Sequence, residues 1–307
     1  MSHFSTLVIV RPGETLDALL QPFHEFECTG INDQFIQDID VTQDYANDEA
    51  EIVMTASGLP RSSTLIARLK ENRIEVLGAF ETPDFEAEHQ FGYAREDEDG
   101  KIIRVFRRTN PNAKWDWWVI GGRFSNRLRD SDGKQCDTVL KSKLDFRHAY
   151  EQFRKEAGEH FDTMRKVVGD NTWKTIGEML ETAKAYAEMT AEEIVERDVY
   201  RLYWEQPGVQ KVIAILKAND PMGAAFMQPK EMDMLLKPRE SFIAYTIQRR
   251  IPTFAVVDKN GWHQSAEMHW FGITSDEMNV TEWFNKFAGL IGEAPDDATL
   301  TVVDCHI

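Results

Sequence analysis

The sequence predicts an α+β protein with a mostly antiparallel sheet formed from both chain ends and an inserted helical subdomain. The chain starts with a short apolar run, "FSTLVIV" at 4–10, and ends with another, "LTVVDCHI" at 300–307. Between them, a long middle part carries apolar side chains at helical spacing. Terminal strands that pair would lie in one sheet. We therefore expect a sheet domain from residues 1–142 and 251–307, and a helical insertion at 143–250.

The other elements follow in chain order from turn and cap signals. A short helix is expected at 15–23, with Thr15 as its N-cap. A hairpin is expected from "FGYARE" and "KIIRVFRR", because the turn Asp99-Gly100 separates them. The stretch "KWDWWVIGG" at 114–122 should return as the next strand of that meander. Near the end, "TFAVVD" reads as a strand and "VTEWFNKFAGLIG" as a helix capped by Thr281.

Length and composition favour a cytoplasmic protein without a membrane anchor. None of the apolar runs in the 307 residues approaches the ~20 residues that span a bilayer. The first residues, "MSHFSTLVIVRPGE", lack the basic region and cleavage site of a signal peptide. The 3 cysteines are widely spaced and unpaired in pattern, as is usual for free thiols in a reducing compartment. We expect a cytoplasmic protein.

The net charge of −17 is unevenly distributed along the chain. Residues 33–51 hold seven acids and no base, and residues 81–99 hold eight acids and one base. Residues 101–129 then hold eight bases and one acid. So acidic a chain is a poor candidate for direct nucleic-acid binding, in which phosphate contacts supply most of the affinity. The basic strip at 101–129 could bind one anion, dock an acidic lobe of the same molecule, or support a homo-oligomer.

The stretch "KWDWWVIGGRF" at 114–124 is the strongest candidate for a ligand site. Large aromatic residues alternate onto both faces of the expected strand, which predicts a central strand buried on both sides. Asp116 would then be a buried charge that needs a partner, with Lys114, Arg123 or Arg104 as candidates.

Two glycines precede Arg123 and permit positive φ and close backbone approach. The backbone N–H groups of the turn could form an anion-binding nest, with the Arg123 guanidinium donating two further hydrogen bonds. Alternatively, Arg123 could simply pair with Asp116. The residues of the predicted ligand site are Lys114, Asp116, Trp117, Gly121, Gly122, Arg123 and Arg104.

Two further patterns suggest chemistry more weakly. His24 and Cys28 near the start, with Cys305 and His306 at the end, could assemble a tetrahedral zinc site. No pair among them has zinc-specific spacing, and Cys305 should point away from His306 in a strand. Otherwise the cysteines are small buried apolar residues.

The second pattern is a pair of His-x-Ser motifs, His3-Phe-Ser5 and His263-Gln-Ser265. Such pairs resemble the acid and base histidines of two-histidine phosphoesterases. About one such match is expected by chance, and a spacing of 260 residues is unusual for a duplicated motif. The chain has no Walker loop, GxSxG, HExxH or GxGxxG motif.

Four phrases, "HFSTLVIV", "PFHEFECTGINDQFIQDID", "NPNAKWDWWVIGGRF" and "LTVVDCHI", resemble a family of uncharacterised proteins encoded by bacteriophages and prophages. The resemblance covers both ends and the middle of the chain, but not residues 143–250. It implies a phage origin and a bacterial host cell, and it assigns no activity and no catalytic residue.

Three functions follow as hypotheses. The first is a phage accessory protein that binds and modulates a host protein, such as one of a defence system, through its acidic surfaces. The second is an enzyme or sensor that binds a small phosphorylated or carboxylated ligand at Gly121-Gly122-Arg123. The third is an acidic mimic of nucleic acid.

Overall fold

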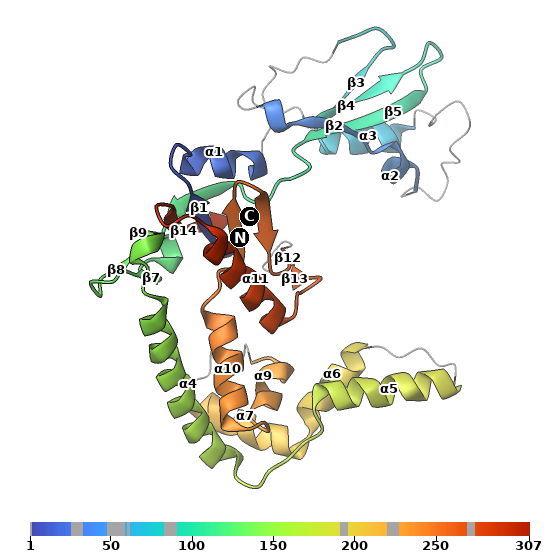
Figure 1. The fold of residues 1–307 in the computed structure, drawn as a ribbon. Coiled ribbons are helices and arrows are strands. Elements are labelled where there is room, and N and C mark those ends of the chain that lie inside the picture. The colour runs from blue at the N-terminus through green and yellow to red at the C-terminus, as the bar shows by residue number, and fades with distance from the viewer. Residues whose placement is uncertain are drawn as a thin grey trace.

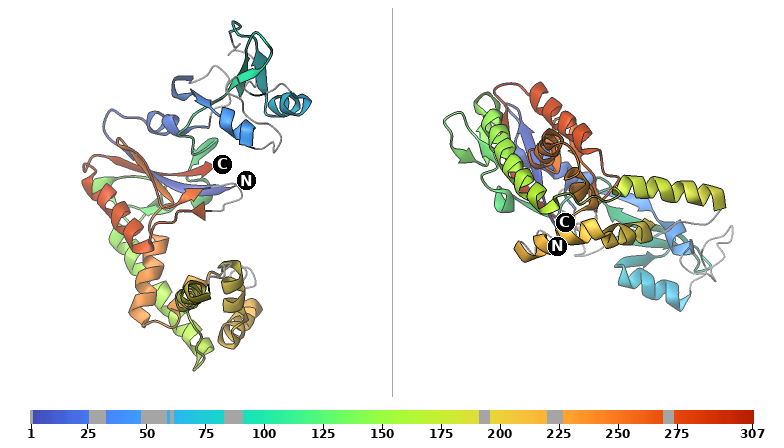
Figure 2. Two further views of the ribbon diagram at one scale, coloured as in Figure 1. Left: turned by 90° about the vertical axis from the view of Figure 1, so that its right-hand side faces the viewer. Right: turned by 90° about the horizontal axis from the view of Figure 1, so that it is seen from below.

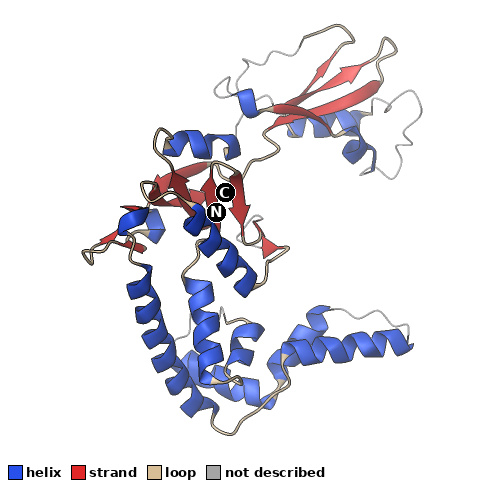
Figure 3. Ribbon diagram, viewed as in Figure 1, coloured by secondary structure: helices blue, strands red, loops and turns tan. Residues whose placement is uncertain are grey.

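The computed structural model describes residues 2–25, 33–47, 59, 62–82, 91–190, 196–219, 227–268 and 274–307. A mixed sheet in the centre separates a small second lobe from a helical region (Figure 1). Strands form the central sheet, two short two-stranded ladders and the sheet of the second lobe, whereas the described part of the helical region contains helices and loops (Figure 3). In the described part of the chain, no helix combines the length and apolar character of a membrane span.

The central sheet is built from both ends of the chain, as the sequence predicts. Strand β1 (His3–Val10) pairs antiparallel with β14 (Thr299–His306) along its whole length, from His3 opposite His306 to Val10 opposite Thr299. The sheet order is β11-β10-β1-β14-β6, and β9 also pairs with β14. Only β1 and β10 run parallel in this sheet. The remaining strands are β6 (Trp117–Ile120), β9 (Thr138–Leu140), β10 (Ala255–Asp258) and β11 (Gly261–Gln264).

Both faces of β1 and β14 are covered, which explains why apolar side chains occur at both odd and even positions of these strands. Helix α11 (Val280–Glu293) packs Trp283 and Phe287 on the face that carries Leu7 and Val302. Helix α1 (Leu16–Leu20) packs Leu20 on the opposite face. Thr15 caps α1 as predicted, since its side chain accepts from the Ala18 N–H. The N-cap of α11 is Asn279 and not the predicted Thr281. The Asn279 side chain accepts a hydrogen bond from the Thr281 N–H.

The second lobe is a four-stranded sheet in the order β2-β5-β4-β3, with α2 and α3 against it (Figure 1). The predicted hairpin is confirmed, because β4 and β5 pair antiparallel. The predicted meander is wrong: β6 leaves this lobe and pairs with β14 in the central sheet. The elements are β2 (Gln37–Asp40), α2 (Thr42–Asn47), α3 (Ser63–Glu71), β3 (Ile74–Leu77), β4 (Gly92–Glu96) and β5 (Ile102–Thr109).

Helices fill the chain between the two parts of the central sheet, as predicted. Helix α4 (Phe146–Val168) starts at Asp145, which accepts from the His148 N–H, and ends at Gly169 with φ 54°. Its apolar stripe packs against α7 and α10, and the views in Figure 2 show this region extending away from the sheet. The others are α5 (Ile176–Thr190), α6 (Glu196–Glu205), α7 (Pro207–Asn219), α9 (Pro229–Met234) and α10 (Arg239–Arg250).

A buried carboxylate connects three helices of this region. Asp233 accepts from Trp173 Nε1 at 3.0 Å, from the Ile176 N–H at 2.8 Å and from the Tyr203 hydroxyl at 2.8 Å. Burial and this carboxylate both raise the pKa of the Tyr203 hydroxyl, so it stays a donor. Each of these three buried donors thus has an acceptor, as a stable interior requires.

Candidate functional site

The glycine pair ends β6 and turns the chain into the short 3₁₀ helix η3 (Gly122–Phe124). Gly121 has φ 69° and Gly122 has φ 53°, so both occupy the region that disfavours other residues. A Cβ on Gly121 would lie 2.5 Å from Asp137 Oδ2, and one on Gly122 would lie 2.5 Å from Asp304 Oδ2. The glycines therefore let two carboxylates of the same chain approach the backbone.

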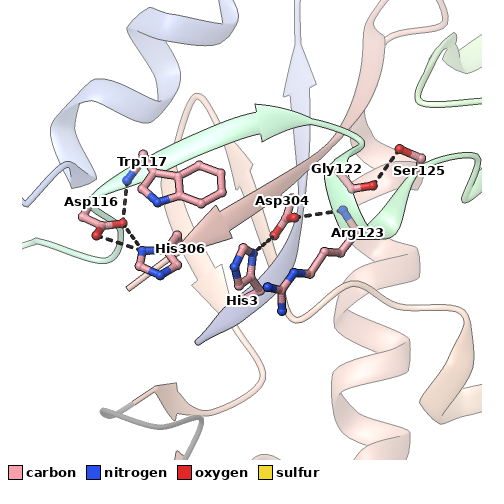
Figure 4. Close-up of polar contacts among 8 residues, drawn as sticks. All are labelled: His3, Asp116, Trp117, Gly122, Arg123, Ser125, Asp304 and His306. Carbon is pink, nitrogen blue, oxygen red and sulfur yellow. Dashed lines mark hydrogen bonds and ion pairs between the residues drawn. The ribbon is translucent and has the colours of Figure 1, made fainter. Parts of the chain in front are cut away.

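The turn does bind an anion, and that anion is Asp304. The backbone N–H of Arg123 donates to Asp304 Oδ2 at 2.9 Å (Figure 4). The N–H of Asn126 likewise donates to Asp137 Oδ1. Nest-like N–H groups in this turn thus hold internal carboxylates, and a bound ligand would have to use the side chain of Arg123.

Two histidine–aspartate pairs lie next to each other at the end of the central sheet (Figure 4). His3 Nδ1 is 2.9 Å from Asp304 Oδ1. His306 Nδ1 is 2.6 Å and 2.8 Å from the two carboxylate oxygens of Asp116. The two imidazole centroids are 5.0 Å apart, with the ring planes at 73°. The sheet thus places two similarly held imidazoles in mutual contact.

The strand register explains this arrangement. His3 and His306 are direct partners in the β1–β14 ladder, and partners in a ladder project from the same face. Asp304 is two residues before His306 on that face, opposite Ser5. Trp117, the partner of His306 on β6, stacks on its ring at 5.1 Å and 14° and meets His3 edge-on at 5.3 Å. The indole thereby limits the orientations of both imidazoles.

Each histidine keeps one ring nitrogen free for other chemistry. Because a carboxylate can only accept, the Nδ1 of each neutral ring must carry the proton, which leaves Nε2 as an acceptor. Within the described residues, neither Nε2 has a hydrogen-bond partner. The His3 side chain is 10% exposed and the His306 side chain 6%, so access is limited to a narrow edge.

The side chain of Arg123 is exposed and extends beside His3 and Asp304 (Figure 4). No ion pair to its guanidinium occurs among the described residues. The predicted partners of Asp116 are therefore wrong, since Asp116 pairs with His306. Lys114 Nζ lies 3.3 Å from Glu267 Oε2, and Arg104 Nη1 lies 2.5 Å from Asp40 Oδ2 in the second lobe. Of the predicted ligand-site residues, the structure brings Asp116, Trp117, Gly121, Gly122 and Arg123 together, and it places Arg104 elsewhere.

The prediction of a central strand is also wrong. β6 lies at the end of the sheet order, and the side chains of Trp117, Val119 and Ile120 are 43%, 44% and 47% exposed. The buried tryptophan of this stretch is Trp115, which comes before the strand and donates its Nε1 to Leu20 O at 3.3 Å. Alternation alone does not separate an edge strand with exposed aromatic residues from a central strand.

The four candidate zinc ligands are not gathered in the described structure. Cys28 lies outside the described residues. Cys305 is fully buried on the face opposite His306, and burial raises the pKa of its thiol to about 12. His24 stacks on Trp115 and its Nε2 contacts Asp116 O at 2.8 Å. No group of three or more metal-binding side chains occurs among the residues that are described.

The second His-x-Ser motif does not meet the first. His263 on β11 lies opposite Val256 on β10. The Nε2 atom of His263 is 3.2 Å from Asp258 Oδ1. Val256 in turn lies opposite Leu7, so His263 is two strands and four residues away from His3. The partner of His3 is His306, which sequence spacing could not identify.

A pocket of about 360 Å³ begins beside this cluster. Ser5 lines it, two residues after His3 on the same face. The rest of the wall comes from α10, α11, Arg127, the segment 252–254 before β10, and residues of the segments 265–266 and 274–278. Two arginines line its other side, and burial lowers the pKa of both guanidinium groups, Arg127 and Arg249. Arg127 Nη2 donates to the carbonyls of Arg250 and Pro252 at 2.8 Å and 2.7 Å. Arg249 pairs with Glu231, and Glu277 also lines the pocket, so its wall carries charges of both signs and suits a polar ligand.

The described parts of the two acidic windows, 33–51 and 81–99, both lie in the second lobe. Asp38 and Asp40 of β2 lie next to β5, opposite Arg108 and Phe106. Asp40 pairs with Arg104. Hydrogen bonds from Thr42, together with the charge of Arg104, lower the pKa of the Asp40 carboxyl group. Charges that are separate in sequence thus partly neutralise each other across the sheet. The exposed acids include Asp44 of α2 and Glu98 and Asp99 at the β4–β5 turn.

The chain matches no protein-family model, no curated protein and no solved structure. Its function must therefore be argued from its own residues.

Proposed function

We propose that this protein binds a small ligand through a phosphoryl or carboxyl group at Arg123, His3 and His306. The observation that carries the proposal is an exposed guanidinium without an ion-pair partner in the described structure, beside two imidazoles with unpartnered Nε2 atoms. A guanidinium fork binds two oxygens of such a group, and an imidazole can donate or accept a third hydrogen bond.

The surroundings support an anion over a neutral ligand. Asp304 and Asp116 contact the two imidazoles at Nδ1, which leaves each Nε2 for contact with a ligand. The neighbouring pocket is lined by Ser5 and adds Arg127. Ser5 is the ladder partner of Asp304, whose Oδ2 accepts from the Arg123 N–H, so the pocket begins beside the residues of the anion site.

Isothermal titration calorimetry with inorganic phosphate and with acetate tests the proposal. Wild-type protein is expected to bind at least one of these anions. Arg123→Ala should weaken binding about 10- to 100-fold, since a hydrogen bond to a charged group contributes about 1.5–3 kcal/mol. Arg104→Ala is the matched control, because this arginine is also exposed but pairs with Asp40 in the second lobe. No binding of either anion, or equal loss in both variants, contradicts the proposal.

A second function is supported by the position of the acidic windows. Asp44, Glu98 and Asp99 all lie on the second lobe, so acids from both windows can meet one partner. We propose that this lobe docks on a basic surface of a host protein, consistent with the resemblance to phage proteins. Charge reversal of these three acids should abolish capture of a partner from bacterial lysate. Capture that survives the reversal contradicts the docking proposal and leaves the anion site unaffected.

A further inference from the structure

We infer that His3 and His306 act as a general acid and a general base that hydrolyse a phosphodiester held by Arg123. This inference rests on the proposed anion site and adds a reaction to it. It depends on three features: two oriented imidazoles, the lack of a better-placed nucleophile on the described strands, and a pocket beyond Ser5 on the side of His3. Arg123 adds a cation beside the two rings.

The first feature is the orientation of both rings. A carboxylate at Nδ1 fixes the tautomer and stabilises the imidazolium when Nε2 gains a proton. His3 has Asp304 for this purpose and His306 has Asp116. Asp304 is itself fixed by the N–H of Arg123, and Asp116 Oδ1 accepts from the Trp117 N–H at 2.7 Å. Both carboxylates are therefore positioning residues with backbone support.

The second feature is the absence of a better-placed nucleophile on the described strands. Ser5 is directed toward β10, where its Oγ accepts from the Phe254 N–H at 3.3 Å. The thiol of Cys305 lies on the opposite face, and burial raises its pKa to about 12. A water molecule is then the nucleophile, and a base and an acid are both needed for one displacement step.

The third feature assigns the two roles. The pocket lies beyond Ser5, on the side of His3, so the leaving group of the diester would occupy it. His306 Nε2 removes a proton from water while the water oxygen forms a bond to phosphorus. The phosphorus–oxygen bond to the leaving group breaks, and His3 Nε2 delivers its proton to that oxygen. The products are a phosphate monoester and an alcohol, and the two histidines exchange their protons with solvent afterwards.

Arg123 supplies the electrostatic part of the reaction. The non-bridging oxygens of the phosphate carry negative charge while the water oxygen approaches phosphorus as its fifth ligand. A guanidinium can donate hydrogen bonds to two of these oxygens and stabilise that charge. The indole of Trp117 stacks on one face of the His306 ring and helps to fix its orientation. No step requires a metal ion, an oxidant or a cofactor.

Hydrolysis of bis(4-nitrophenyl) phosphate by the full chain, in buffer with EDTA, tests the inference. Wild-type protein should release 4-nitrophenol above the buffer rate. His3→Ala and His306→Ala should each lower kcat about 10²- to 10⁴-fold. The Kd for phosphate should rise by no more than about 10-fold, the cost of one lost hydrogen bond. His263→Ala is the control, since this histidine pairs with Asp258 on another strand, and it should keep the wild-type rate.

A milder variant guards against misfolding. Asp116 has a 41% exposed side chain, so Asp116→Asn should fold and should lower kcat with little change in KM. Wild-type protein that binds phosphate but releases no 4-nitrophenol overturns the inference and leaves the anion site intact. A His306→Ala variant with wild-type kcat overturns it as well. Failure to bind phosphate or acetate, measured separately, is instead the failure of the proposed function.

Discussion

His3 and His306 face each other across the β1–β14 ladder, with ring centroids 5.0 Å apart, although 302 residues lie between them in the chain. Each ring is held by a different carboxylate, one from β14 and one from the segment before β6. The pairing of the two chain ends therefore creates the candidate site, and the stability of this end of the sheet decides whether the site exists.

Gly122→Ala should destabilise the protein more than Gly100→Ala. Both glycines have positive φ, 53° and 74°, so both variants suffer the backbone cost of about 1 kcal/mol. Only at Gly122 would the new Cβ meet a neighbour, Asp304 Oδ2 at 2.5 Å, while nothing lies within 4 Å at Gly100. Urea denaturation should show an additional loss of about 1–3 kcal/mol for Gly122→Ala. Equal losses in the two variants would contradict the close approach of Asp304 to the turn.

Asp304→Ala should lower the free energy of unfolding by about 2–3 kcal/mol, because it removes the acceptor of His3 Nδ1 and of the Arg123 N–H. Asp296→Ala is a suitable comparison, since that carboxylate is 86% exposed and lies 3.5 Å from Lys141. Its loss should stay below about 0.5 kcal/mol. Similar unfolding midpoints in urea for the two variants would mean that Asp304 does not connect β1, β14 and η3.

Cys305 should make the protein sensitive to alkali. Its folded-state pKa is raised by burial from 9.0 to about 12, so its contribution to stability is complete below pH 9 and is lost as the pH rises toward 12. Between pH 8 and 10.5, wild-type protein should lose about 1–2 kcal/mol more of its unfolding free energy than Cys305→Val does. Urea titrations at the two pH values measure this difference. Equal losses would show that the thiol ionises freely in the folded state.

Asp233→Ala should destabilise the helical region by about 3 kcal/mol, because three buried donors, Trp173 Nε1, Ile176 N–H and Tyr203 OH, lose their acceptor. Asp198→Ala, an exposed partner of Arg201 at 3.7 Å, should change little. Thermal unfolding followed by circular dichroism compares the variants. If Asp233→Ala unfolds like Asp198→Ala, the buried network is not what connects these helices.

The fold class could be predicted because burial leaves a direct pattern in the sequence. Residues 4–10 and 300–307 are rich in apolar side chains at both odd and even positions because both faces of the sheet are covered. Helix α4 shows an apolar stripe because one side packs on α7 and α10. The pairing of β6 was not predictable, since its aromatic alternation fits an edge or a centre equally well. Its true partner, β14, lies near the other end of the chain.

The candidate site was predicted in part. The glycine turn and Arg123 were found from local chemistry, since positive φ and a neighbouring cation are local features. The partner of Asp116 was missed because it depends on the register of two distant strands. The expected pairing of the chain ends held the missing signal: antiparallel alignment of 3–10 with 299–306 puts His3 opposite His306.

The most direct test of the anion site is a long-range proton–nitrogen NMR spectrum of the histidine rings, recorded as inorganic phosphate is added to the wild-type protein. Assigned through His→Gln variants, the Nε2 resonances of His3 and His306 should move with phosphate and saturate together, while that of His263 stays in place. Phosphate that leaves the His3 and His306 resonances unchanged, or that moves the resonance of His263 alone, would contradict the site.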